Sequence, residues 1–167
     1  MKLFRNSLLV ITLLFTLASC TKDENVFVDE VNYSIDLNLA NETDWLMANE
    51  ILAIINEHRA SIGLQAIKSD QQYASAYAVD HTQYMIKISQ INHDNFELRK
   101  KALMDRGAEA VSENVASGYT TASDVVAAWL NSPSHRRTIE GKYTHSGFGV
   151  IQNERGTYFF TQLFYRK

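Results

Sequence analysis

Apolar residues recur at the spacing of an α-helix in three stretches of the chain. These stretches are residues 44–64, 69–87 and 122–130. In the first stretch, Ile51 and Ile55 lie about one turn apart, and Gly63 follows as a left-handed helix end. In the second, tyrosines form one stripe, while Ala74 and Ala78 are small enough to permit close packing on a neighbouring face. The pattern predicts three amphipathic helices.

The C-terminal part of the chain changes to the two-residue period of β-strands. Residues 145–166 alternate like two strands joined by a turn at 153–156, which has glycine at its last position. Several helices, one short central segment and a terminal β-hairpin predict an α+β fold. We expect the helices to pack on a small antiparallel sheet.

The N-terminal residues have the pattern of an export signal. Two basic residues precede an apolar run at 8–17, which is too short to span a bilayer. The run ends in LASC, and this resembles a bacterial lipoprotein signal in which Cys20 is acylated; ordinary cleavage near a chance cysteine is the alternative. We predict a signal peptide at 1–19, an acidic tether at 20–43 and a folded domain at 44–167.

The composition supports an exported, membrane-anchored domain. Cys20 is the single cysteine, so an acylated chain would fold without disulfides. The net charge of −3 and the lack of basic runs argue against a nucleic-acid partner. We expect a location in the cell envelope, outside the cytoplasm and attached to the membrane. The cluster Lys22-Asp23-Glu24 is similar to the acidic export signals of some surface-displayed lipoproteins, although a solvated linker explains it equally well.

The stretch LNSPSHRRTI (130–139) offers the first candidate for chemistry. Ser132 and Pro133 are typical of a helix start, which puts His135 at the third helical position. The positive end of the helix dipole disfavours protonation of an imidazole there. We therefore expect a neutral imidazole, the form that binds metals or accepts hydrogen bonds.

Two other segments carry further candidates. His93 lies in the polar loop INHDNF, and Glu113 lies in the segment VSENVASG. In an extended segment, the side chain of Glu113 would share one face with two valines. A carboxylate on an apolar face needs a cation, a histidine or a metal nearby, unless the face is open to solvent. We expect His58 and His81, which lie in helical patterns, to be structural or exposed.

Taken together and in this order, these motifs resemble the CAP superfamily (cysteine-rich secretory proteins, antigen 5 and pathogenesis-related proteins), specifically its short bacterial branch. The matching stretches are NEHRASIGL, AVDHTQYM followed by NHDNF, SENVASG, AAWLNSPSHRRTI and YTHSGFGV. The resemblance covers about residues 46–165. The resemblance implies a three-layer α-β-α sandwich with a central cleft lined by His93, Glu113 and His135.

The chain also departs from the pattern of secreted eukaryotic members of that family. Many of them have a second acidic residue three positions after the tryptophan equivalent to Trp129, where this chain has Ser132, and they have disulfides that this chain lacks. Ser132 and His145, which begins a strand pattern, are additional candidates for the cleft.

Three functions remain open at this point. The cleft could bind a divalent metal such as zinc, or a small ligand, lipid or peptide of unknown identity, because two imidazoles and a carboxylate match a zinc site with one open position. It could be a metal-dependent, peptidase-like hydrolase, although a metal-bound Glu113 would leave no general base. It could also be a non-catalytic structural or interaction module with a buried hydrogen-bond network. We favour binding, and whether the protein is an enzyme stays open.

Overall fold

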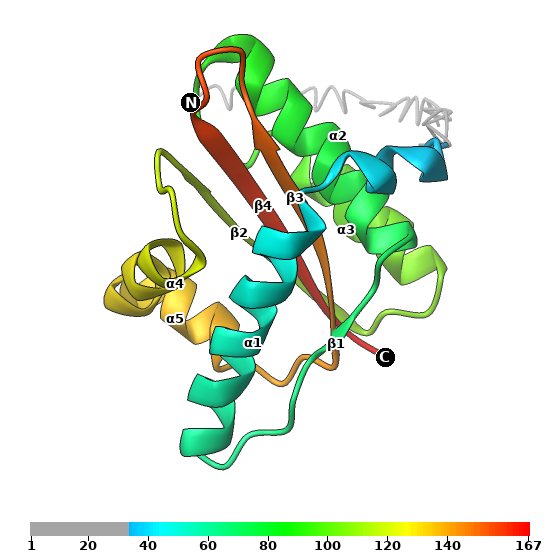
Figure 1. Cartoon of the computed structure of the whole chain (residues 1–167). Coiled ribbons are helices and arrows are strands. Elements are labelled where there is room, and N and C mark those ends of the chain that lie inside the picture. Colours follow the sequence, from blue (N-terminus) through cyan, green and yellow to red (C-terminus); the bar gives the residue numbers. More distant parts are fainter. Residues whose placement is uncertain (1–33) are drawn as a thin grey trace, which may run out of the picture. The chain divides into compact units, whose positions relative to one another are not determined.

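The computed structural model describes residues 34–167, so the predicted signal peptide and Cys20 lie outside the described residues. These residues form a short 3-10 helix, five α-helices and four strands (Figure 1). In order they are η1 (Leu37–Glu42), α1 (Trp45–Ser61), β1 (Lys68–Ser69), α2 (Tyr73–Ile88), α3 (Phe96–Asp105), β2 (Ala110–Ser117), α4 (Ala122–Asn131), α5 (Pro133–Ile139), β3 (His145–Gln152) and β4 (Tyr158–Arg166).

The four strands form one sheet in the order β1-β3-β4-β2. Strands β3 and β4 are the predicted antiparallel hairpin, and Gly156 in its turn has the positive φ of 75° that favours glycine. Strand β2 pairs antiparallel with β4 and forms one edge. The two residues of β1 add a short parallel pairing with β3 at the other edge, which the sequence pattern did not predict.

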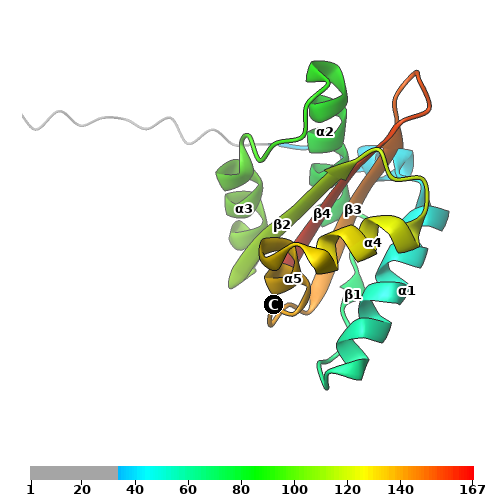
Figure 2. The same ribbon diagram turned by 90° about the vertical axis from the view of Figure 1, so that its left-hand side faces the viewer.

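Helices cover both faces of this sheet, as the α-β-α prediction requires (Figure 2). On one face, Ile51 and Ile55 of α1 pack with Trp129 of α4 against aromatic residues of the hairpin. On the other face, α2 and α3 enclose a second core that includes Tyr77 and Leu163. The predicted α+β fold is confirmed, and α3 is a helix that the sequence pattern did not predict.

Helix α2 lies directly on β3 because glycines leave room for its backbone. A Cβ atom at Gly147 would overlap the backbone of Ala74, and one at Gly149 would overlap the carbonyl of Ala78. Both alanines are fully buried. The predicted close packing of Ala74 and Ala78 is therefore confirmed, and the partner surface is a strand with no side chains at these two positions.

The residues just before 44, the predicted start of the folded domain, pack against the domain in the structure. Helix η1 packs against α2, and Ala40 is buried. The hydroxyl of Thr43 donates to the carbonyl of Phe148 at 2.7 Å, and the Asp44 N–H donates to that of Val150 at 2.9 Å. These bonds attach the end of the predicted tether to β3 of the described domain.

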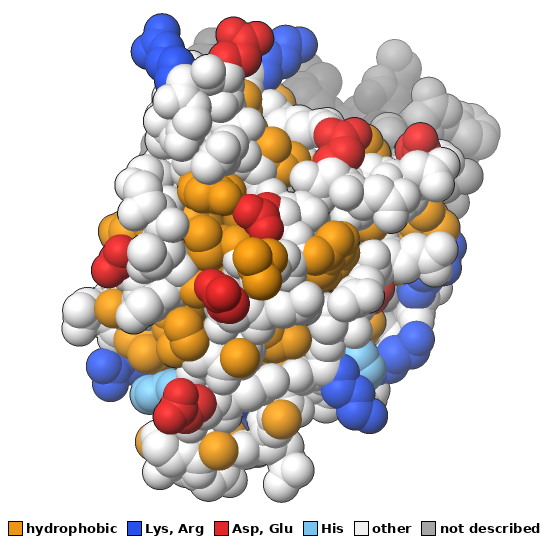
Figure 3. All heavy atoms as spheres, viewed as in Figure 1, with side chains coloured by type: hydrophobic (Ala, Val, Ile, Leu, Met, Phe, Trp, Pro, Cys, Tyr) orange, Lys and Arg blue, Asp and Glu red, His pale blue; other side chains and the backbone are white. Residues whose placement is uncertain are grey.

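The outer surface around α1 mixes apolar and charged groups. Figure 3 shows apolar side chains in the middle of this face, interrupted by acidic groups, with Lys and Arg at its margins. Leu46, at the start of α1, is 75% exposed. None of the described helices is long and apolar enough to cross a membrane.

Candidate functional site

Glu113 is a buried carboxylate in the middle of the edge strand β2. It pairs in register with Leu163 of β4, and only 7% of the residue is exposed. The neighbouring valines 111 and 115 pack into the cores on the α2 and α3 side, as the predicted shared face requires. A charge in such a place is costly unless cations and hydrogen-bond donors surround it.

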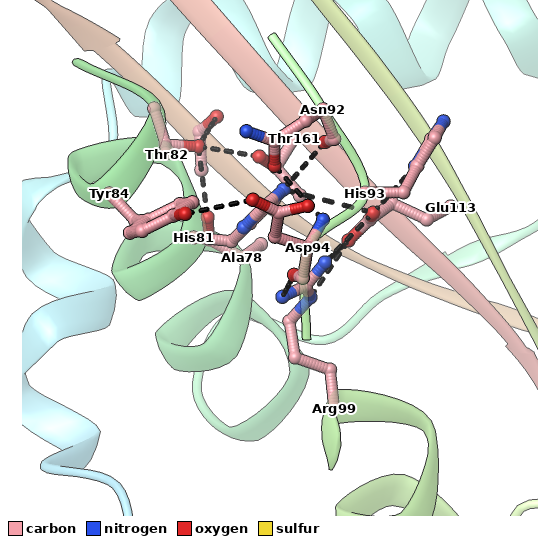
Figure 4. Close-up of polar contacts among 11 residues, drawn as sticks. Ala78, His81, Thr82, Tyr84, Asn92, His93, Asp94, Arg99, Glu113 and Thr161 are labelled. Atoms are coloured by element: carbon pink, nitrogen blue, oxygen red, sulfur yellow. Dashed lines mark hydrogen bonds and ion pairs between the residues drawn. The ribbon is translucent and has the colours of Figure 1, made fainter. Parts of the chain in front are cut away.

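Arg99 of α3 supplies that cation. Its Nε donates to Glu113 Oε2 and its Nη2 to Glu113 Oε1, both at 2.9 Å, so the guanidinium binds the carboxylate with two parallel bonds (Figure 4). Arg99 is itself 2% exposed. The sequence reasoning missed this residue, because it lies in the charged segment FELRKKALMD (96–105).

His93 makes the third contact with the carboxylate. Its Nδ1 lies 2.8 Å from Glu113 Oε1. An ionised carboxylate only accepts hydrogen bonds, so Nδ1 carries the proton and Nε2 of the neutral ring keeps its lone pair. The His93 side chain is 53% exposed. The geometry therefore fixes the tautomer and leaves Nε2, on a side chain that is about half exposed, with a free lone pair.

His81 supports the same network from within α2. Its Nε2 lies 2.9 Å from the carbonyl of Asn92 and 3.9 Å from Glu113 Oε1, so its proton is directed at the carbonyl. Burial, and then the nearby Arg99 charge, lower the pKa of His81. His81 is 2% exposed and stacks on Tyr84, with ring centroids 5.9 Å apart. It is structural, as predicted, and it holds the loop that presents His93.

The loop at 89–95 is attached at a second point, Asp94. The hydroxyl of Tyr84 donates to Asp94 Oδ2 at 2.8 Å, and Nη1 of Arg99 donates to the Asp94 carbonyl at 2.7 Å. Ser89 and Asn95, at the ends of the loop, have φ values of 54° and 57°. Side chains from α2 and α3 thus fix the position of His93 between them.

His135 approaches from α5, which packs on the opposite face of the sheet. Pro133 occupies the first helical position, as predicted. The amide nitrogen of Asn114, next to Glu113 on β2, donates to the His135 carbonyl at 3.3 Å. Burial, and then the charge of a protonated His93, lower the pKa of His135. The predicted neutral imidazole agrees with this direction, but burial and His93 cause the shift here.

Strand β2 therefore bonds to the two histidine segments from opposite faces of the sheet. Neighbouring residues of a strand point to opposite faces, so Glu113 points toward α3 and Asn114 toward α5. The imidazole of His93 contacts Glu113 directly, whereas His135 is joined to the neighbouring Asn114 through its backbone carbonyl. The structure therefore brings His93 and Glu113 into contact and places the His135 backbone beside the next residue of β2. A shared cleft of all three side chains stays a prediction.

The carboxylate is less available to a metal than its family position implies. Both oxygens of Glu113 accept bonds from Arg99, and Oε1 also accepts from His93. In residues 34–167, no group of three or more His, Cys, Asp or Glu side chains is arranged to hold a metal ion. Glu113 fits the role of a partner that orients a ligating histidine from behind.

The two additional candidates have other surroundings. His145 stacks on Tyr165 with centroids 5.0 Å apart, and its Nδ1 lies 2.8 Å from the hydroxyl of Thr144. Burial, and then the charge of Lys68, lower the pKa of His145. Ser132 lies 3.2 Å from the hydroxyl of Ser134, at the start of α5. The structure gives neither residue a bond to His93 or Glu113.

The buried ion pair generates a prediction about stability. Arg99→Met leaves the Glu113 charge buried without its cation, so we expect the free energy of unfolding to fall by about 3–5 kcal/mol. Adding Glu113→Gln removes the charge and should restore a large part of this loss. Urea unfolding measures the free energy of both variants.

The control is Arg166→Met, because the Arg166–Glu109 pair is exposed and should contribute less than about 1 kcal/mol. A double variant as unstable as Arg99→Met would contradict the ion-pair account.

The buried histidine generates a prediction about pH. Because the pKa of His81 is lowered in the folded state, the unfolded chain binds more protons below about pH 6.5. The stability that neutral His81 contributes is thus complete above that pH and is lost as the pH falls toward the folded-state pKa.

The variant His81→Gln tests this pH dependence, because it keeps a donor for the Asn92 carbonyl and does not titrate. We expect its unfolding free energy, from urea titrations at several pH values, to fall less steeply in acid than that of the parent. Parallel profiles would exclude His81 as a cause; His135 and His145, also with lowered pKa values, would contribute the remaining slope.

Comparison with known proteins identifies the family of this chain. The model of the cysteine-rich secretory protein family, CAP, matches residues 52–164. The chain is 31% identical over 127 residues to the uncharacterized membrane protein YlbC of Bacillus subtilis, covering 71% of this chain but 34% of that protein. It thus spans about a third of the length of this curated relative.

Two solved structures are also similar. An extracellular protein containing a SCP domain from Bacillus anthracis is 27% identical, with a TM-score of 0.58, and the match covers 71% of this chain and 40% of that one. An outer surface protein from Borrelia burgdorferi shares the fold, with a TM-score of 0.66, 22% identity and coverage of 73% of this chain and 93% of that one. The family match extends over most of the described domain and includes His93, Glu113 and His135. The chain belongs to the cysteine-rich secretory protein (CAP) family.

Proposed function

We propose that this CAP domain is a binding module, in which His93 and His135 hold a divalent metal ion of the zinc class through their imidazoles. The observation that carries the proposal is the 2.8 Å contact between His93 Nδ1 and Glu113. It fixes the proton on Nδ1 and directs the free lone pair of Nε2 away from the carboxylate. Metal-binding histidines commonly have such a carboxylate partner.

The state of His135 supports the same role. Metals bind the neutral imidazole, and the lowered pKa of His135 keeps its ring neutral at neutral pH. Two protein nitrogens leave the remaining coordination positions of a zinc-class ion to water or to a small ligand. The bound ion would supply a Lewis-acidic position there, and this chain's residues would hold and orient the two imidazoles.

The surroundings favour binding over hydrolysis. A metal-dependent hydrolase needs a group that accepts a proton from the attacking water. Glu113 is fully engaged with Arg99 and His93, and the side chain of Asp94 accepts from Tyr84. Both oxygens of Glu113 and one oxygen of Asp94 are thus already engaged. This favours binding over hydrolysis, and we propose no catalytic step.

Zinc titration of the chain starting at Thr21 tests the proposal, because the described residues belong to a single compact unit. We expect zinc at one hundred times its dissociation constant to raise the free energy of unfolding by about 2.7 kcal/mol, read as a higher melting temperature. His93→Ala and His135→Ala should each remove most of this gain.

A partly buried histidine of α1, away from β2, provides the matched control. His58 also lies 2.9 Å from a carboxylate, that of Glu140, and His58→Ala should leave the zinc response unchanged. Equal melting temperatures with zinc and with chelator, or an equal loss in all three alanine variants, would exclude a zinc site at His93 and His135.

We also propose that acylated Cys20 holds the domain at the outer side of a membrane, in the cell envelope. The support is the sequence LASC after a short apolar run, together with a relative described as an extracellular protein. Two or more acyl chains on one residue anchor a protein stably, since each buried CH2 contributes about 0.8 kcal/mol.

Changing the acylated residue tests the anchor. We expect Cys20→Ser to move the protein from the membrane fraction to the soluble fraction and to remove label incorporated from a tagged fatty acid. The parent chain and the His58→Ala variant, which keep Cys20, should remain membrane-bound and labelled. A Cys20→Ser protein that stays with the membrane would refute this anchor.

A further inference from the structure

The sheet face beneath α5 contains two buried amide side chains that face each other. Asn114 of β2 and Gln162 of β4 are directly paired in the antiparallel register, so their side chains lie on the same face of the sheet. Both residues are fully buried. Asn114 Oδ1 and Gln162 Oε1 each lack a hydrogen-bond partner among the described residues.

The nitrogen atoms of the same amides are already in use. Asn114 Nδ2 donates to the His135 carbonyl at 3.3 Å, and Gln162 Nε2 donates to the Ser146 hydroxyl at 3.0 Å. If the Asn114 amide were rotated by half a turn, its Oδ1 would face the carbonyl oxygen of His135, and two acceptors would meet with no donor between them. The bond to His135 therefore fixes this oxygen as an acceptor that needs a donor from elsewhere.

Leaving both oxygens unpaired would be unfavourable in these surroundings. Trp129, Phe148 and Phe164 belong to the core on this face of the sheet, and a buried acceptor without a partner costs about 1–3 kcal/mol. Native interiors rarely leave such groups unpaired, and ordered water commonly fills the need.

We propose that one internal water molecule lies between Asn114 and Gln162 and donates one hydrogen bond to each amide oxygen. Water fits because it brings two donors and no charge, and both side chains that would bind it are neutral. A metal ion or ammonium would bring into this apolar core a charge that neither amide could balance.

The water site itself is independent of the proposed function. Its consequence for His135 deepens that function and rests on it. Asn114 donates a hydrogen bond to the carbonyl of His135. A water that fixes the orientation of the Asn114 amide therefore also stabilises the position of α5. Asn114 and Gln162 are then positioning residues for His135, and neither contacts the proposed metal.

Water-selective NMR on the chain starting at Thr21, without added metal, tests the site. We expect magnetisation transfer from long-lived bound water to the side-chain amide protons of both Asn114 and Gln162. Gln162→Met removes one of the two oxygens and should abolish the transfer to Asn114. Ser146→Ala is the matched control, because it removes the partner of the Gln162 nitrogen and keeps both oxygens; there the transfer should remain.

A high-resolution crystal structure of the parent chain tests the proposal without any variant. A single water within hydrogen-bonding distance of both oxygens would support it. A Gln162 amide turned to donate directly to Asn114, a cation in this place, or an empty space would overturn it. Since neither experiment uses zinc, a failed water site and a failed zinc titration give separate results.

Discussion

The buried pair of Arg99 and Glu113 is the interaction on which the rest of the site depends. It joins α3 to the edge strand β2 through two hydrogen bonds and gives the buried carboxylate a cationic partner inside the domain. Once Glu113 is charged and fixed, His93 has one tautomer and one exposed nitrogen. A buried ion pair of this kind is weak evidence for added stability, because desolvation offsets much of its attraction. What it provides here is a defined direction for an imidazole.

The two imidazoles are held by different parts of the molecule. The His93 loop is fixed by His81 and Tyr84 of α2 and by Arg99 of α3, whereas His135 depends on α5 and on Asn114. The edge strand β2 is common to both supports, since it provides Glu113 on one face and Asn114 on the other. A site built around a sheet edge brings together residues from both helical layers without passing through the core.

Much of this arrangement followed from the sequence. Periodicity predicted helices α1, α2 and α4 and the hairpin, and short motifs pointed to His93, Glu113 and His135 as candidates. The sequence did not predict α3, because FELRKKALMD is rich in charge and its apolar stripe is short. Phe96, Arg99 and Leu103 recur at helical spacing, so the signal for a buried arginine was present but weak. Without Arg99, the sequence could not show whether a metal or a cation offsets the charge of Glu113.

The direct contact between α2 and β3 has a consequence for the position of the His93 loop. With no side-chain layer between the helix backbone and Gly147 or Gly149, backbone contact sets the distance from α2 to the sheet. His81 belongs to α2 and bonds to the carbonyl of Asn92 in that loop. A side chain at either glycine would therefore displace not only the helix but also the support of a loop that lies beyond its C-terminal end.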